Sequence, residues 1–84
     1  MHYQRQQIEA YFQAALDLSN DRELSSIIED IALMVRLDRV AELGWMAELM
    51  DLYYENNSEA VTLVLDTIQY YLVIYSQFNE RKNI

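Results

Sequence analysis

The chain has 84 residues, enough for one domain but only for a small hydrophobic core. Its 14 acidic and 6 basic side chains give a net charge of −8, which argues against direct binding to nucleic acid or a membrane surface, since both require clustered Lys and Arg. It has no Cys for disulfides yet is 52% hydrophobic, and this apolar surplus indicates oligomerisation or a docked partner.

The first segment has the spacing of a helix. With no Pro and a single Gly in the chain, helices joined by short loops are favoured. Apolar side chains recur at every third or fourth position, which predicts a helix over residues 3–18. These side chains are Ile8, Tyr11, Phe12, Ala15 and Leu16.

A second helix is predicted over residues 21–37. Asn20, followed three residues later by Glu23, has the spacing of a capping box, in which each side chain satisfies a free amide at the helix start. The regular apolar face of this helix consists of Leu24, Ile27, Ile28, Ile31, Met34 and Val35.

The sequence leaves the end of the second helix open, because residues 36–39 contain neither Gly nor Pro. If Asp38 caps a new helix, a third helix covers 39–55. Without a break, residues 21–55 would form one rod of about 50 Å, which a single protomer of this size could hardly cover. We favour the break. The expected core side of the third helix is Val40, Leu43, Ala47, Met50 and Tyr54.

A fourth helix is predicted over 58–79, followed by a tail at 80–84. Asn56 and Glu59 repeat the capping-box spacing next to the clearest loop. A hairpin of strands is the alternative, because Val, Thr, Ile and Tyr, which are frequent in 61–75, favour sheets. We prefer a helix because the polar residues follow one helical stripe. That stripe consists of Thr62, Asp66, Gln69, Ser76, Gln77 and Glu80.

The remaining circumference of the fourth helix is apolar. One stripe contains Val61, Val64, Leu65, Ile68, Leu72, Tyr75 and Phe78, and Leu63, Tyr70, Tyr71 and Ile74 widen it. A helix with so wide an apolar surface needs neighbours on at least two sides. We therefore expect an all-α protein, a small three- or four-helix antiparallel bundle with the C-terminal helix central, and we expect it to be dimeric.

Catalytic chemistry has little support in this sequence. The single His is His2, near the chain start, and the single Lys is Lys82, in the expected tail. A general base, or a Ser activated by one, cannot be assembled without His2. No Glu-x-x-His pair is present to hold a metal on a helix. We predict no enzyme, no catalytic residue, no cofactor and no metal site.

Two sets of side chains are candidates for binding. Trp45 lies off the core stripe of the third helix and predicts a second apolar face, either a wider core contact or an interface. Adjacent tyrosines such as Tyr70 and Tyr71 point about 100° apart, so one of each pair should face away from the core. The interface candidates are Trp45, Leu49, Leu52, Tyr53, Tyr70, Tyr71 and Ile74. The acidic-face candidates, from a stretch between Val40 and Glu80 without Lys or Arg, are Glu42, Glu48, Asp51, Glu55 and Glu59.

The sequence contains no sign of export or of a membrane anchor. Residues 1–18 carry Arg5, Glu9 and Asp17 and lack the uncharged apolar core of a signal peptide. Residues 60–75 fall short of the ~20 that span a bilayer. We therefore expect a cytoplasmic protein.

Together these features predict a small acidic regulatory protein of bacterial or phage type. We expect it to act by binding, as a homodimer or to another, possibly basic, protein, through an aromatic-rich helical face. The alternative is an acidic inhibitor or immunity-type protein that occupies the basic site of a nuclease or other nucleic-acid-binding protein.

Overall fold

The helices begin and end close to where the periodicity places them. The computed structural model describes the backbone of residues 2–53 and 58–82, and the side chains of 4–52 and 58–77. The four helices in these ranges are α1 (His2–Leu18), α2 (Arg22–Arg36), α3 (Val40–Tyr53) and α4 (Glu59–Lys82). The all-α prediction is confirmed, and the strand hairpin over 61–75 is wrong. Helix α4 continues through Lys82, into the segment that we expected to be a tail.

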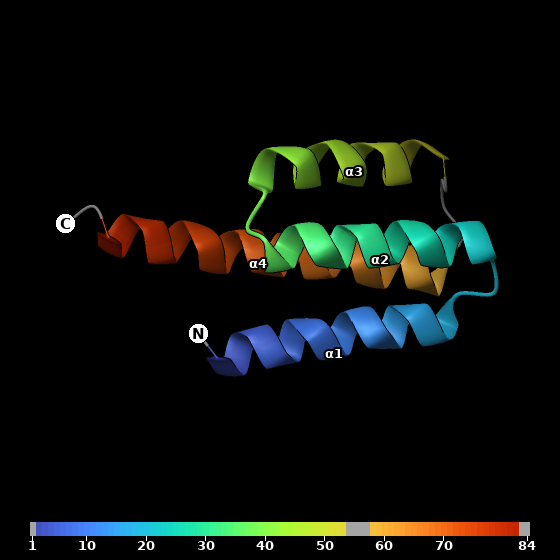
Figure 1. Cartoon of the computed structure of the whole chain (residues 1–84), viewed down its shortest axis with the longest axis horizontal. Coiled ribbons are helices and arrows are strands. Elements are labelled where there is room, and N and C mark those ends of the chain that lie inside the picture. Colours follow the sequence, from blue (N-terminus) through green and yellow to red (C-terminus); the bar gives the residue numbers. More distant parts are fainter. Residues whose placement is uncertain (1, 54–57, 83–84) are drawn as a thin grey trace.

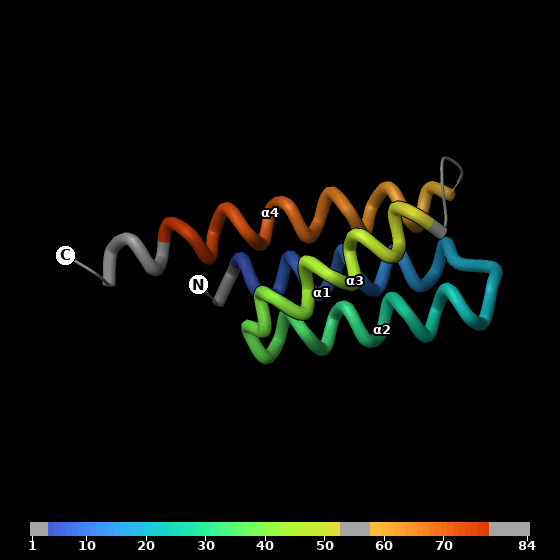
Figure 2. Tube along the Cα trace, turned by 90° about the horizontal axis from the view of Figure 1, so that it is seen from above, coloured from blue at the N-terminus to red at the C-terminus, as the bar shows by residue number. Residues whose placement is uncertain are grey.

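The helices run alternately in opposite directions and form an antiparallel bundle (Figure 1). Helices α2 and α4 lie at opposite edges of the bundle in Figure 2, and in Figure 1 α1 lies on one side of this pair and α3 on the other, crossing obliquely. Both α2 and α4 contact all three other helices, so α4 shares the central position with α2. In the described part of the chain α1 and α3 make no contact. Helix α3 is therefore covered on one side only.

The core lies between the four helices. Its largest fully buried side chains come from α2, α3 and α4 and are Ile28, Ile31, Leu43, Met50 and Val64. Helix α1 contributes Ile8, Phe12 and Ala15. Burial of this apolar surface is the main term that stabilises the fold.

The buried stripe of α4 is rotated from the predicted one. Ile68 and Tyr71 are buried, whereas Leu72 and Tyr75 are only partly covered. Thr67 is also buried, and its hydroxyl donates to the Leu63 carbonyl oxygen at 2.6 Å. This bond satisfies the hydroxyl within its own helix. Of the predicted polar stripe, Thr62, Asp66, Gln69, Ser76 and Gln77 are exposed, and the side chain of Glu80 lies outside the described residues.

Both helix caps differ from the expected ones. At α2 the cap is Asp21, whose carboxylate accepts from the Glu23 amide at 2.9 Å, so the capping box predicted from Asn20 is wrong by one residue. At α4 the Ser58 hydroxyl accepts from the amides of Ala60 at 3.2 Å and Val61 at 3.4 Å. Asn56, the expected cap, lies outside the described residues. Side chains of this kind satisfy amides that have no partner inside the helix.

We predict that Ser58→Ala lowers the free energy of unfolding by about 1 kcal/mol, because two amides at the start of α4 lose their acceptor. Urea unfolding followed by circular dichroism measures this change. Ser76→Ala, an exposed substitution inside the same helix, is the control and should be neutral or slightly stabilising, since Ala is the better helix former. A Ser58→Ala variant as stable as the parent would contradict the cap.

Candidate interaction surface

The turn between α2 and α3 decides how α3 is presented. The Asp38 amide donates to the Val35 carbonyl oxygen at 3.1 Å, and the Arg39 amide donates to that of Met34 at 3.0 Å. Asp38 has φ of 55°, the left-handed conformation in which helices commonly end. The helix therefore stops here without a glycine, and the single rod over 21–55 does not form.

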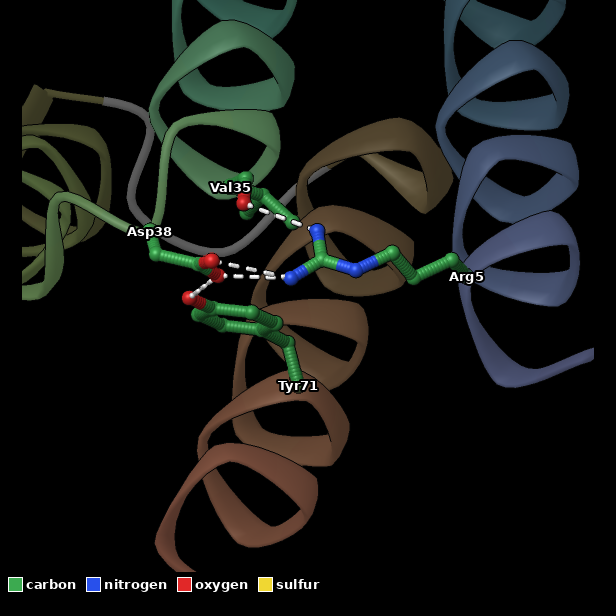
Figure 3. Close-up of polar contacts among 4 residues, drawn as sticks. All are labelled: Arg5, Val35, Asp38 and Tyr71. Atoms are coloured by element: carbon green, nitrogen blue, oxygen red, sulfur yellow. Dashed lines mark hydrogen bonds and ion pairs between the residues drawn. The ribbon is translucent and has the colours of Figure 1, made fainter. Parts of the chain in front are cut away.

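The prediction that Asp38 caps the following helix is wrong. The first bond of α3 is accepted by the Arg39 carbonyl oxygen, 2.9 Å from the Leu43 amide. The Asp38 carboxylate instead turns towards α1 and α4 (Figure 3). Its two oxygens accept from Arg5 Nη2 at 2.8 and 3.0 Å, and Oδ1 also accepts from the Tyr71 hydroxyl at 2.6 Å. One side chain thus fastens the turn to the first and the last helix.

These contacts shift the pKa values of both Asp38 and Tyr71. Burial alone would raise the pKa of Asp38, but the hydrogen bonds from Tyr71 and Arg5 outweigh it and hold that pKa below its usual value. Burial and the adjacent carboxylate raise the pKa of Tyr71. Its hydroxyl therefore stays protonated at neutral pH and can act as the donor.

The turn sets α3 with one face on the bundle and the opposite face in solvent. Leu43 and Met50 are buried, while Trp45, Leu49 and Leu52 are 75%, 52% and 68% exposed. The exposed residues, with Ala41, follow one another at intervals of four, four and three, which aligns them on one side of a helix. We call Ala41, Trp45, Leu49 and Leu52 the α3 outer face. The structure thus places Trp45 at the surface and not in the core.

The other interface candidates lie elsewhere. Tyr70 contacts α1, with its hydroxyl 3.0 Å from Gln7 Oε1 and its ring 6.3 Å from that of Tyr11. Because α1 does not reach α3, this pair is separate from the α3 outer face. Tyr71 is only 3% exposed and belongs to the core, and Ile74 is partly buried against it. The side chain of Tyr53 lies outside the described residues.

Acidic side chains border the α3 outer face. Glu48 and Asp51 are exposed on one side of the stripe, and Glu42 is exposed on the other, where it accepts from Arg39 Nη1 at 3.3 Å. We call these three residues the acidic rim. Glu59 is exposed at the start of α4, where a negative charge is favourable, and Glu55 lies outside the described residues.

A groove of about 490 Å³ between α1 and α2 is the other surface depression of interest. Its lining includes Phe12, Leu33 and the ion pair between Arg36 Nε and Glu9 Oε1, which are 2.6 Å apart. In residues 2–53 and 58–82 no three His, Asp or Glu side chains come together in a way that could hold a metal ion. None of the helices in these ranges combines the length and hydropathy that crossing a membrane requires.

Comparison with known proteins finds no matching family model, no similar curated protein and no similar solved structure. The residues of this chain therefore supply all the evidence on its function.

We predict that Asp38→Asn lowers the free energy of unfolding at pH 7 by about 1 kcal/mol, the order expected for partly exposed hydrogen bonds to a charged group. Asn also tolerates the left-handed conformation, so the turn itself is kept. The folded-state pKa of Asp38 is lowered, so its contribution is present above the unfolded pKa of about 4 and is lost as pH falls through the folded value. Urea unfolding from pH 7 to pH 3 should show the parent and the variant converging in stability.

The control is Asp66→Asn, which removes an exposed carboxylate from the outer edge of α4. It should leave the stability at pH 7 nearly unchanged. A difference between the parent and Asp38→Asn that is the same at pH 7 and pH 3 would contradict a stabilising role for the charge.

We also predict that Tyr71→Phe and Asp38→Asn are not additive. Tyr71→Phe removes the 2.6 Å hydrogen bond, and Asp38→Asn removes the negative charge that strengthens it, so the double variant should be more stable than the sum of the single losses indicates, by about 0.5–1 kcal/mol. Tyr70→Phe, at the neighbouring position, should combine additively with Asp38→Asn. Equal coupling energies for the two tyrosines, measured by urea unfolding, would show that the bond does not act in solution.

Proposed function

We propose that this chain is a small non-enzymatic binding protein whose α3 outer face docks another protein chain. The observation that carries the proposal is the exposure of Trp45, Leu49 and Leu52 on one side of a helix whose other side is buried. Burying a Leu side chain stabilises a protein by roughly 1.5–3 kcal/mol. In a domain with so small a core, three large apolar side chains left in water are best explained by a partner.

The composition of the face also favours binding. Trp is among the residues that contribute most to protein interfaces, and such residues cluster with apolar neighbours at the centre of the contact. Trp45 has Leu49 and Ala41 one turn to either side. A straight apolar stripe of this kind suits packing against a second helix.

A second candidate function is that of an acidic inhibitor of a nuclease or other nucleic-acid-binding protein. The acidic rim favours it, since Glu48 and Asp51 are exposed and no Lys or Arg occurs from Val40 to Glu80. A surface that only imitates phosphates has no need of an exposed Trp at its centre. We therefore rank this function below docking through the apolar stripe.

The proposed setting is the cytoplasm of a bacterium or of a cell infected by phage, with regulation of the bound protein as the role. The absence of Cys from the sequence is compatible with a reducing compartment. A binding role without catalysis is supported by a sequence whose single His and single Lys stand near its two ends.

We predict that Leu52→Ser and Trp45→Ser abolish association while changing the free energy of unfolding by less than about 0.5 kcal/mol, because both side chains are already in water. Light scattering over a concentration series measures self-association. A photoreactive amino acid at position 49, used in the cells that naturally produce the protein, traps a different partner as a discrete crosslinked species.

Val73, 56% exposed on α4, supplies the matched control. Val73→Ser should leave association intact, and a photoreactive group at position 73 should not give the species trapped from position 49. Association that survives both Leu52→Ser and Trp45→Ser would rule out this face. Leu43→Ser, at a fully buried position, is the reference for a core substitution. A loss of stability in either variant as large as that of Leu43→Ser would instead place its side chain in the core.

A further inference from the structure

We infer that the partner of the α3 outer face is an α-helix whose own apolar stripe is bordered by Lys or Arg, and not a second copy of this chain. The inference rests on the proposed function and names the chemistry of its partner. It follows from the shape of the stripe, the charges beside it and the small apolar area that it offers.

The shape of the stripe favours a helix. From Ala41 to Leu52 it runs straight for about 17 Å, at 1.5 Å per residue, and it is one side chain wide. An extended peptide docks by adding to the edge of a sheet, and the described residues contain no strand. A helix lying along α3 can instead place its side chains between Trp45, Leu49 and Leu52, as packed helices do.

The charges beside the stripe favour a basic helix. Glu48 is three residues after Trp45 and four before Leu52, so it stands directly next to both. Asp51 lies on the same side, and Glu42 lies on the other. Charges that flank an apolar helical seam decide which helix can pair with it. Glu42 is paired with Arg39, and no Lys or Arg occurs from Val40 to Glu80, so Glu48 and Asp51 supply most of the negative charge that this rim offers to a partner.

A second copy fits this surface poorly. Two α3 helices packed by their outer faces would bring their acidic rims together, in two chains that each carry a net charge of −8. The exposed apolar area of the three large side chains is on the order of 400 Å², whereas stable interfaces bury about 800 Å² on each partner. The acidic rim must supply the remaining interface area. The rims of two copies repel each other, whereas a rim attracts Lys and Arg.

Trp45 reports directly on this site. It is the single Trp of the chain and is 75% exposed, so we expect its fluorescence emission to be that of an indole in water. A helix that covers the face removes the indole from water and shifts its emission to shorter wavelength. Fluorescence titration of the whole protein therefore measures occupancy of this face with no added label.

Three designed helical peptides without aromatic residues test the inference. The first has a Leu stripe bordered by Lys, the second has the same stripe bordered by Glu, and the third has the Lys residues but Ser in place of the stripe. We expect the first to shift the Trp45 emission with a Kd at least tenfold lower than that of the second, and the third to cause no shift. The tenfold advantage should shrink between 50 and 500 mM NaCl, because exposed charges are screened by salt.

Charge reversal on the protein supplies the matched variants. The double substitution Glu48→Lys, Asp51→Lys should reverse the preference, so that the Glu-bordered peptide binds more tightly. The double substitution Glu29→Lys, Asp66→Lys changes the net charge equally at exposed sites on α2 and α4 and should keep the original preference. Circular dichroism confirms that each variant is folded.

The possible failures are distinguishable. Equal affinity for the Lys- and Glu-bordered peptides would overturn the basic partner and leave the docking face in place. So would a dimer in light scattering whose formation shifts the Trp45 emission, because the occupant would then be a second copy. If no peptide shifts the emission and Leu52→Ser alters no association, both the inference and the proposed function are wrong.

Discussion

The arrangement of the bundle depends on a helix that ends in a left-handed turn without glycine. A β-carbon in this conformation costs roughly 1–2 kcal/mol, which a glycine at position 38 would avoid. Glycine, however, could not accept hydrogen bonds from Arg5 and Tyr71, as the Asp38 carboxylate does. The same residue that adopts the left-handed conformation therefore also ties the turn to α1 and α4. The residue that ends α2 thus also connects three parts of the bundle. Without that closure, α3 would continue along the axis of α2 and the core residues of α4 would lose one of their covers.

The exposed face of α3 is a consequence of how four helices share one core. Helices α2 and α4 each contact all the others, and α1 and α3 lie on opposite sides of this pair. Helix α1 is thus too far away to cover α3, and within the described ranges no further element remains to do so. Leu43 and Met50 pack in the core, whereas Trp45, Leu49 and Leu52 are each more than half exposed and contribute little to the stability of the monomer.

Local patterns in the sequence were sufficient for the helices and for the two faces of α3, because side-chain spacing along a helix is set by its geometry. The contact at Asp38 was beyond reach, since Arg5 and Tyr71 each lie 33 residues from it and no local signal connects them. The adjacent tyrosines show the same limit. Spacing indicated that one of Tyr70 and Tyr71 faces outward, but the choice depends on partners from other elements: Asp38 for Tyr71, and Gln7 with Tyr11 for Tyr70. The cap of α2 was predicted wrongly for a related reason: Asn20 and Asp21 are both good capping residues, and the path of the backbone selects between them.

The acidic rim opposes contact between copies of the chain through the exposed stripe. An apolar face invites association between copies, but copies that approach through α3 must first bring Glu42, Glu48 and Asp51 of both chains close together. For the partner that we propose, a basic helix, the same charges would be attractive, so the barrier to self-association and the steering of that partner would have one physical origin. The Asp38 carboxylate fastens the turn before α3 through Arg5 and Tyr71, and neither of these residues belongs to the stripe or the rim. Under the proposed function, stability and recognition are therefore separable in this fold: a change at the stripe or rim would alter which chain docks, whereas a change at Asp38 would alter how α3 is held.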